Sequence, residues 1–265
     1  MSRVSFDNVA VAYDDFMGRW TRAFMPALLR AAGVGRGQRV LDVATGTGES
    51  ALMLSDTVGA AGSVVGADIS LPMLARAAGK TQGRRIGLVV ADGQSLACRA
   101  DTFDRVLCQL GLHFFPDPVA GVREARRVLR PAGTFGATVW SVPERVPWFY
   151  LLGREIVQHF PERHDDIFIG SRLGEGGRLE RILVEAGLRD VRTATETRPM
   201  EFASFEEYWG FVQSGAIRIG QMLRELTPES AEAIRERIRA AMTAFAAGDR
   251  LVMPTEVVVA AGTAS

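Results

Sequence analysis

The segment from Val40 to Glu49 carries the most informative chemistry in this sequence. It reads Val-Leu-Asp-Val-Ala-Thr-Gly-Thr-Gly-Glu, an apolar run that passes directly into two closely spaced glycines. Glycine lets a backbone approach a bound group where a Cβ would collide. If a helix follows, its first N–H groups favour an anionic ligand group. The segment predicts a strand, a binding turn and a helix, although an ordinary tight turn also fits the pattern, as does a relaxed dinucleotide fingerprint through Ala51.

Three aspartates lie in or at the ends of neighbouring apolar runs. Asp68 lies 20 residues beyond Gly48, where a carboxylate can accept hydrogen bonds from both hydroxyls of a ribose. Asp92 ends the next run, and Asp42 lies inside the first, where dinucleotide enzymes usually have an apolar residue. One such carboxylate is commonly a helix cap. Three of them converge on the crevice where open α/β sheets bind ligands, so we interpret them as a binding site.

The elements that position these residues alternate regularly up to Trp140. Buried parallel strands are predicted from apolar runs at Val40–Val43, Ser63–Ala67, Ile86–Ala91, Arg105–Leu110 and Thr134–Trp140. Helices are predicted between them at Glu49–Thr57, Leu71–Ala78 and Val119–Arg130, the last stopped by Pro131 and Gly133. This alternation predicts an α/β, Rossmann-like, doubly wound and mostly parallel sheet.

Beyond Trp140 the pattern changes. Residues 142–175 read as irregular and aromatic-rich, and residues 203–247 read as helical, with Thr227 as N-cap before Pro228. A helix at Arg178–Ala186, a strand at Asp190–Thr197 and a last, antiparallel strand at Glu256–Ala261 after Pro254 are also predicted. We expect one domain over 1–265 with a seven-stranded sheet, lid helices within 1–30, and cap insertions at 142–175 and 203–247 that bind the substrate.

Composition excludes several classes of function. The 265 residues include 31 Lys+Arg and 31 Asp+Glu, which leaves no basic footprint for nucleic acid or for a membrane surface. No run approaches about 18 uninterrupted apolar residues, so no membrane span is predicted. Cys98 and Cys108 lack the spacing of a metal site and read as reduced thiols. With no signal-peptide pattern at the N-terminus, we expect a cytoplasmic protein without a metal.

The motifs, taken in order, resemble those of the class I S-adenosylmethionine-dependent methyltransferases. The small-molecule enzymes that include the ubiquinone/menaquinone C-methyltransferases are the most similar. The resemblance covers about residues 10–140 and rests on Asp42–Glu49, Asp68, Asp92-Gly93, Phe103–Leu107 and Val128–Gly133. Ala44 departs from it, because many relatives have a glycine there. The resemblance implies S-adenosylmethionine as cofactor and S-adenosylhomocysteine as its product.

The resemblance also implies a role for individual residues. The loop Ala44-Thr45-Gly46-Thr47-Gly48 would pass under the methionine portion of the cofactor, with Asp42 near its ammonium, and Asp68 would hold the ribose. Beside the adenine or at its edge, the resemblance places Ile69, Met73, Ala91, Asp92 and Gly93. Gln109 and Leu110 would line the sulfonium. Tyr13 and Trp20 would belong to an N-terminal lid.

Methyl transfer from a sulfonium is an in-line displacement that needs alignment and the exclusion of water. A base is needed only if the acceptor loses a proton, and His113 is the candidate base or positioning group, although packing of the strand end explains it equally well. Aromatic residues in both insertions favour a bulky apolar or aromatic acceptor such as a quinone, polyketide or terpenoid. The candidate substrate contacts are Trp148, Tyr150, His159, Phe205 and Trp209.

Two other functions stay open. The glycine fingerprint with Asp68 also fits an NAD(P)-dependent oxidoreductase, although Asp42, Asp92 and the lack of a Tyr-x-x-x-Lys pair oppose it. A cyclase or binding protein could use the same fold and cofactor without methyl transfer. The residues Cys108–Gly111 differ from the Asn/Asp-Pro-Pro-aromatic motif of adenine and glutamine methylation. We therefore expect a small-molecule substrate, no nucleic acid or membrane partner, and leave a homo-oligomer open.

Overall fold

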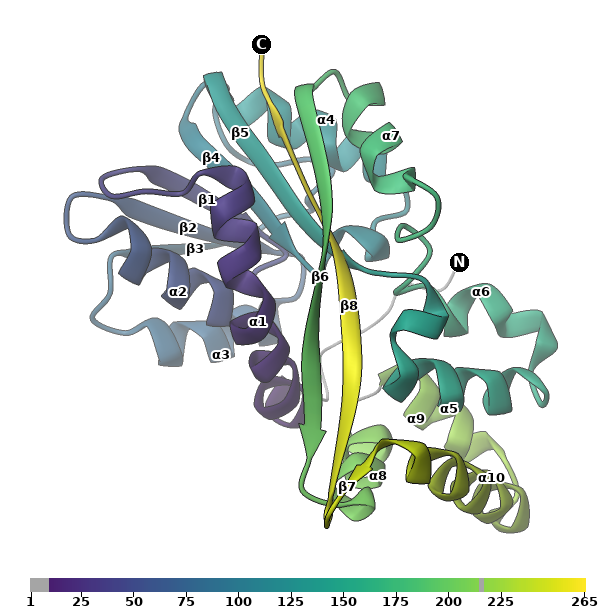
Figure 1. The fold of residues 1–265 in the computed structure, drawn as a ribbon. Coiled ribbons are helices and arrows are strands. Elements are labelled where there is room, and N and C mark those ends of the chain that lie inside the picture. Colours follow the sequence, from purple (N-terminus) through teal and green to yellow (C-terminus); the bar gives the residue numbers. More distant parts are fainter. Residues whose placement is uncertain (1–9, 215–216) are drawn as a thin grey trace.

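One mixed β-sheet organises the chain (Figure 1). The computed structural model describes residues 10–214 and 217–265. Within them the strands are β1 (Arg39–Val43), β2 (Ser63–Asp68), β3 (Ile86–Val90), β4 (Phe103–Gln109), β5 (Leu129–Trp140), β6 (Arg189–Phe202), β7 (Ala246–Ala247) and β8 (Arg250–Thr263). Their order is β3-β2-β1-β4-β5-β8-β6, and β7 pairs only with β8. The strand β8 runs antiparallel to β5 and β6, so the predicted mostly parallel, doubly wound sheet with an antiparallel last strand is confirmed.

Helices cover both faces of the sheet. On one face lie α1 (Ala10–Ala32) and α2 (Glu49–Val58), and on the other lie α4 (Pro118–Val128) and α7 (Arg178–Glu185). Each helix buries one apolar stripe against the strands, as an amphipathic helix must. The buried residues on these stripes include Phe24 and Leu28 of α1, Leu54 of α2, Val122 of α4 and Leu183 of α7.

Local signals set where several helices begin. The side chain of Ser70 accepts a hydrogen bond from the backbone N–H of Met73 and so starts α3 (Leu71–Thr81). Asp117 accepts the N–H of Ala120 in the same way at the start of α4. The predicted N-cap Thr227 is confirmed at α10 (Pro228–Met242). Ser70 and Asp117 follow β2 and β4, so these two caps help to fix where the chain leaves the sheet, whereas Thr227 lies between α9 and α10.

Several predicted boundaries are wrong. The helix α4 ends at Val128, before Pro131, because β5 already begins at Leu129 and pairs with Phe103 of β4. The last strand contains Pro254 instead of following it. Pairing of β8 with β5 stops at Val257 and pairing with β7 covers Arg250 and Leu251, so at Pro254 the strand is paired on one side only, with Pro199 of β6. Proline is tolerated where a strand has a free side.

The two insertions are more regular, and more divided, than predicted. Residues 142–175 contain α5 (Pro147–Val157) and α6 (His164–Ile167), although the segment reads as irregular. The described residues of 203–247 are largely helical, as predicted, and form α8 (Phe205–Ser214), α9 (Ile217–Glu225) and α10 before the two-residue strand β7. Figure 1 shows α5, α6, α9 and α10 grouped at the lower right, beyond the end of β5, with α8 beside β7.

Two further observations concern the chain as a whole. Over the described residues, the longest helices are too short or too polar to cross a membrane. The two cysteines are free, and Cys108 is buried in β4. Burial raises the pKa of the Cys108 thiol well above its usual range, so it stays protonated at neutral pH.

Candidate functional site

The direction of strand order reverses between β1 and β4, which are neighbours in the sheet. Open α/β sheets bind ligands at the carboxyl ends of the strands beside such a reversal. The residues that follow these two strands, Ala44 and Leu110, both have left-handed backbone, with φ of 59° and 52°. Such geometry costs about 1–3 kcal/mol for a non-glycine residue and clusters at functional sites. We call the carboxyl ends of β1–β4, with residues 44–48, 68–69, 91–93 and 109–110, the strand edge.

The loop after β1 is open on one side and packed on the other. A Cβ added at Gly46 (φ 55°) would meet no atom within 4 Å, whereas one at Gly48 (φ 85°) would lie 3.0 Å from the Cβ of Ala77 in α3. The N–H of Thr45 donates to the carbonyl of Ala67 at 3.1 Å, which ties the loop to β2. Gly46 therefore presents bare backbone on the open side, and Gly48 permits the close contact with α3 that supports it.

Asp42 lies beneath this loop and is fully buried. Its Oδ2 accepts hydrogen bonds from the hydroxyls of Thr45 and Ser50, both at 2.5 Å. Its Oδ1 is buried and has no hydrogen-bond partner within the described residues. Burial raises the pKa of Asp42 to about 6 against the effect of the two hydroxyls, and the charge of Asp68 adds to the rise. A buried acceptor without a donor fits the cationic ammonium implied by the resemblance, met directly or through water.

Asp68, the last residue of β2, holds the loop in addition to its predicted role. Its Oδ2 accepts the N–H of Gly46 at 2.8 Å, and its Oδ1 accepts the N–H of Ser70 at 2.9 Å. Burial raises the pKa of Asp68, and the hydrogen bonds from Ser70 and Gly46 act against that rise. The backbone N–H of Ile69 acts against the rise as well, and the carboxylate, with about four lone-pair positions, keeps room for a ribose hydroxyl. The bond to Gly46 was not anticipated from the sequence.

The residues predicted to flank the adenine differ in exposure. Ile69 is 52% exposed directly after Asp68, so a large apolar side chain is open at the strand edge. A planar ring laid on that side chain would cover it, as the prediction requires. Met73 of α3 is 2% exposed, so its side chain offers almost no surface to an adenine ring.

At the end of β3, Ala91 and Asp92 are half-buried and Gly93 is buried. Asp92 accepts the backbone N–H of Gln94 at 2.9 Å. A Cβ added to Gly93 would lie 2.3 Å from the ring of Phe115, so the glycine is required by packing. These residues lie at the strand edge as predicted, next to the segment that follows β4.

Gln109 is the last residue of β4, and its side-chain amide has a hydrogen-bond partner for the oxygen but, within the described residues, not for the nitrogen. Its Oε1 accepts the hydroxyl of Thr138 at 2.8 Å, and that same hydroxyl accepts the N–H of Leu110 at 3.2 Å. This chain of bonds orients the amide, while its Nε2 is buried with no partner within the described part of the chain. The strand edge therefore holds a fixed donor at the position where the resemblance expects the sulfonium.

His113 follows β4 in the short 3-10 helix Leu112–Phe114 and is 1% exposed. Its ring lies 4.3 Å from that of Phe114. Burial lowers the pKa of His113 to about 3, and the nearby charge of Arg172 lowers it further. The imidazole is therefore uncharged at neutral pH. Its enclosed position favours the packing or positioning role over that of a base open to an acceptor.

The N-terminal and insertion aromatics meet beside the end of β5. Trp20 of α1 lies 5.4 Å from Trp140, the last residue of β5, and 5.7 Å from Trp148 of α5, measured between ring centroids. Trp148 also contacts Phe211 of α8 at 5.8 Å. We call these four residues the aromatic assembly. Trp20 is thus a core residue in this structure, and the side chain of Tyr13 lies outside the described residues.

The other predicted substrate contacts are not brought together. Phe205 and Trp209 stack on each other at 6.0 Å in α8 and are 8% exposed. Tyr150 is half-buried in α5, and His159 is exposed after it. Of the five, Trp148 is the one that joins the aromatic assembly. Consecutive aromatic residues on a helix point in different directions, so the sequence could not select among them.

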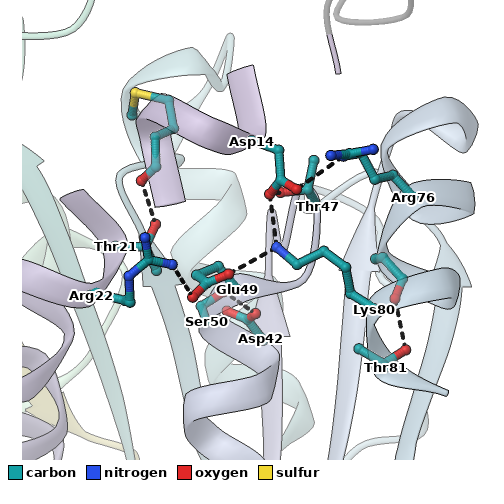
Figure 2. A network of polar contacts seen from close by, with 12 residues as sticks. Asp14, Thr21, Arg22, Asp42, Thr47, Glu49, Ser50, Arg76, Lys80 and Thr81 are labelled. Atoms are coloured by element: carbon teal, nitrogen blue, oxygen red, sulfur yellow. Dashed lines mark hydrogen bonds and ion pairs between the residues drawn. The ribbon is translucent and has the colours of Figure 1, made fainter. Parts of the chain in front are cut away.

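One group of polar residues near the glycine loop was missed (Figure 2). Asp14 of α1 accepts hydrogen bonds from Thr47 Oγ1 at 2.5 Å, Arg76 Nε at 2.9 Å and Lys80 Nζ at 2.8 Å. Lys80 also donates to Glu49, the first residue of α2, at 2.8 Å. One signal in the sequence could have drawn attention to it, because Lys80 is the only lysine among 31 Lys+Arg.

Known proteins are similar to this chain over between about half and nine-tenths of its length. A model of a methyltransferase domain matches residues 41–137. Nocamycin O-methyltransferase of Saccharothrix syringae is 30% identical over 257 residues, 92% of this chain and 91% of that protein. A ubiquinone/menaquinone biosynthesis C-methyltransferase of Coxiella burnetii is 35% identical over 153 residues, 54% of this chain and 60% of that protein. An uncharacterized protein of Mycobacterium tuberculosis is 37% identical over 118 residues, and the match spans 44% of this chain and 42% of its own length.

Solved structures share the fold. Phosphoethanolamine N-methyltransferase 2 of Haemonchus contortus, in complex with S-adenosylmethionine, superposes with a TM-score of 0.61 at 19% identity, over 98% of this chain and 57% of that one. The YcgJ protein of Bacillus subtilis superposes with a TM-score of 0.59 at 18% identity, over 90% and 97%. At these identities the agreement concerns architecture, and it extends beyond the sheet into the second half of the chain.

Proposed function

Since the chain belongs to the S-adenosylmethionine-dependent methyltransferases, we propose that it methylates a small, bulky apolar or aromatic acceptor such as a quinone, polyketide or terpenoid. The bound cofactor supplies an activated methyl group, and the protein has to align the acceptor with it. We propose that residues 1–265 act as one methyltransferase domain. In it, residues 1–30 cover the cofactor, and residues 142–175 and 203–247 recognise the acceptor.

The strand edge would hold the cofactor. The open backbone at Gly46 would lie under its methionine portion, the unpartnered Oδ1 of Asp42 would receive the ammonium, and Asp68 would accept the ribose hydroxyls. Ile69 offers an exposed apolar side chain to the adenine, with Ala91, Asp92 and Gly93 at its edge. The buried Met73 would contribute only by supporting α3.

The aromatic assembly is the observation that carries the acceptor class. Trp140 ends β5 two residues after Thr138, whose hydroxyl bonds to Gln109 at the predicted sulfonium position. We propose that these indole and phenyl rings, which are buried against one another in this structure, would form the wall nearest the transferred methyl group once an acceptor is bound. Such a wall favours an apolar or aromatic acceptor over a charged one, because a charged group would lose hydration there without a partner. Nocamycin and quinone methyltransferases among the relatives support this class.

Alignment and the exclusion of water would carry the catalysis. We propose that His113 positions the segment after β4 and is not the general base, because its imidazole is enclosed and uncharged. The acceptor would then bring an acidic phenol or enol proton that leaves to solvent. With an unpartnered Nε2, Gln109 could donate a hydrogen bond to an acceptor oxygen and hold it in line with the methyl group.

The balanced charge supports a small molecule as the partner, with neither nucleic acid nor membrane as substrate. We expect the enzyme to act in the cytoplasm. Association with a second copy stays a prediction, to be tested by its mass in solution.

The proposal is tested by product analysis. Purified protein is incubated with S-adenosylmethionine and either hydroxylated naphthoquinones and phenols or phosphoethanolamine, and products are detected by mass spectrometry. We expect methylated aromatic products with equimolar S-adenosylhomocysteine, and none in Asp68→Ala. Methylation of phosphoethanolamine alone would refute the acceptor class. Tight binding of S-adenosylhomocysteine with turnover of a substrate but no methyl gain would favour a cyclase.

A further inference from the structure

Asp14 connects three elements that meet at the glycine loop, and the predicted cofactor roles do not account for it. It lies in the second turn of α1 and is 9% exposed. Its carboxylate contacts Thr47, which lies between the two loop glycines, together with Arg76 and Lys80 of α3. Figure 2 shows these side chains converging above the loop. A buried carboxylate is retained only where donors compensate its desolvation, and here there are three of them.

Lys80 extends the connection back to α1. Its ammonium bridges Asp14 Oδ1 and Glu49 Oε2 at 2.8 Å each, and Glu49 Oε1 accepts from Arg22 of α1 at 2.5 Å. Burial acts to raise the pKa of Asp14, but hydrogen bonds from Lys80 and Thr47 outweigh it, so the pKa lies below its usual value. In Glu49 the bonds from Lys80 and Arg22 have the same effect. Both carboxylates therefore stay charged at neutral pH, and the pairs persist.

The single lysine suits this position. An ammonium is a compact charge with three donors that can point toward carboxylates on different helices. A guanidinium holds its donors in a rigid planar fork, so it meets two carboxylates only where both lie close to that plane. All 30 other Lys+Arg residues of the chain are arginine, so the lysine stands where two separate carboxylates, from α1 and α2, share one cation.

We propose that Asp14 is a positioning residue of the cofactor site, and that with Lys80 and Thr47 it forms a latch coupling the docking of α1 to the order of the glycine loop. When α1 is docked, the hydroxyl of Thr47 is fixed and the loop presents Gly46 to the cofactor. When α1 detaches, Thr47 loses its acceptor and Lys80 loses one of its two carboxylates. Such coupling is reciprocal: a cofactor that requires the ordered loop also holds α1 down.

The latch rests on the cofactor and not on the proposed acceptor, so it can be tested without any substrate. The affinity of S-adenosylhomocysteine is measured by calorimetry for wild type, Asp14→Asn, Thr47→Val and the double variant. We expect about a tenfold weaker affinity in Asp14→Asn, the loss of one charge-assisted interaction. In the Thr47→Val background the same change should have little further effect. A tenfold loss in both backgrounds would show that Asp14 does not act through Thr47.

Arg19→Gln is the matched control. It removes another ion pair of α1, to Glu207 at 2.6 Å on the surface, and should leave the affinity unchanged. An equal loss in this variant would mean that affinity follows the docking of α1 in general and not the contact between Asp14 and Thr47, which overturns the role assigned to Asp14. Thermal unfolding of each variant keeps affinity separate from folding.

A second readout uses the single lysine as a reporter. Acetylation of Lys80 by an amine-reactive ester is followed by mass spectrometry in wild type and Asp14→Asn, with and without S-adenosylhomocysteine. Without ligand, Lys80 should react several-fold faster in Asp14→Asn, since one of its two carboxylate partners is gone. In wild type the ligand should slow the reaction. Equal rates in both proteins, or no protection of wild type by a ligand that binds, would overturn the latch.

Discussion

The strand edge and the insertion helices differ in what they expose and what they bury. At the strand edge the backbone is accessible: Ala44 and Leu110 hold left-handed conformations, and Gly46 exposes bare peptide groups. In the insertions the side chains fill the space, with Trp148 packed against Trp20, Trp140 and Phe211. We propose that fixed backbone geometry binds the cofactor and that the shape of the aromatic side chains selects the acceptor.

This contrast predicts that mutations in the insertions mainly lower the free energy of unfolding, whereas mutations at the strand edge mainly lower the affinity for the cofactor. The largest expected effect is that of Trp148→Ala. Its ring is 6% exposed among three aromatic neighbours of the aromatic assembly, so its removal should lower the free energy of unfolding by about 3–5 kcal/mol. Urea unfolding measures this change. The Kd of the folded variant for S-adenosylhomocysteine should stay within about twofold of the wild-type value, because effects at separate sites are largely independent. A loss of affinity as great as in Asp68→Ala would show that the insertions and the strand edge do not affect stability and cofactor affinity separately.

The next largest effect concerns acid stability. Because the pKa of His113 is about 3 in the fold against an ordinary 6.5, its contribution is fully present above pH 6.5 and is lost as pH falls toward 3. Between pH 6.5 and 4 this one group should lower the free energy of unfolding by up to about 3 kcal/mol. Urea unfolding of His113→Gln at both pH values should show a smaller decrease than wild type. Equal decreases would show that the imidazole is not buried.

Asp68→Ala tests the strand edge by affinity. The change removes the acceptor of Gly46 N–H and the predicted ribose partner, so the Kd for S-adenosylhomocysteine should rise about 10- to 100-fold. Calorimetry measures it. Asp56→Ala is the control, because that carboxylate is 63% exposed and pairs with Arg84 on the surface. An unchanged Kd in Asp68→Ala would contradict the assigned role.

The smallest expected effect tests backbone contact across the strand edge. A Cβ at position 111 would lie 2.5 Å from the Cβ of Ala44, so Gly111→Ala should lower the free energy of unfolding by about 1–2 kcal/mol. Adding Ala44→Gly removes the colliding atom and relieves a left-handed alanine, and should restore most of the loss. If the double variant is no more stable than Gly111→Ala alone, the two segments do not touch as described.

The sequence predicted the strand edge well because motif and geometry coincide there. Asp42, Gly46 and Asp68 occupy fixed places relative to strand ends, so their spacing alone brought them together. The sequence did not predict the hydrogen bonds that these loop residues make to distant segments. Asp68 also binds Gly46 N–H, and Asp14 reaches Thr47 from 33 positions away. Contacts between distant segments leave no local period in a sequence.

The insertions were harder to predict for a physical reason. In α5 the buried Trp148, Leu152 and Ile156 recur at helical spacing. The apolar residue Phe149 beside them hides this spacing in the sequence, because it is not on the buried face. Among the described residues of 203–247, α10 ends at Met242, and a 3-10 helix at Thr243–Phe245 leads the chain into β7 and back to the sheet. Which aromatic side chains face an acceptor depends on helix rotation, and the apolar pattern there is satisfied by core packing as well as by a ligand.

We propose that this enzyme methylates an apolar aromatic acceptor held beside the strand edge. The most direct measurement is a competition assay, in which one reaction contains S-adenosylmethionine labelled with a trideuterated methyl group, a hydroxylated naphthoquinone and phosphoethanolamine. Mass spectrometry of both acceptors should find the label on the naphthoquinone in step with S-adenosylhomocysteine, and a loss of the signal in Asp68→Ala but not in Asp56→Ala. Label on phosphoethanolamine instead, or undiminished transfer by Asp68→Ala, would contradict the account.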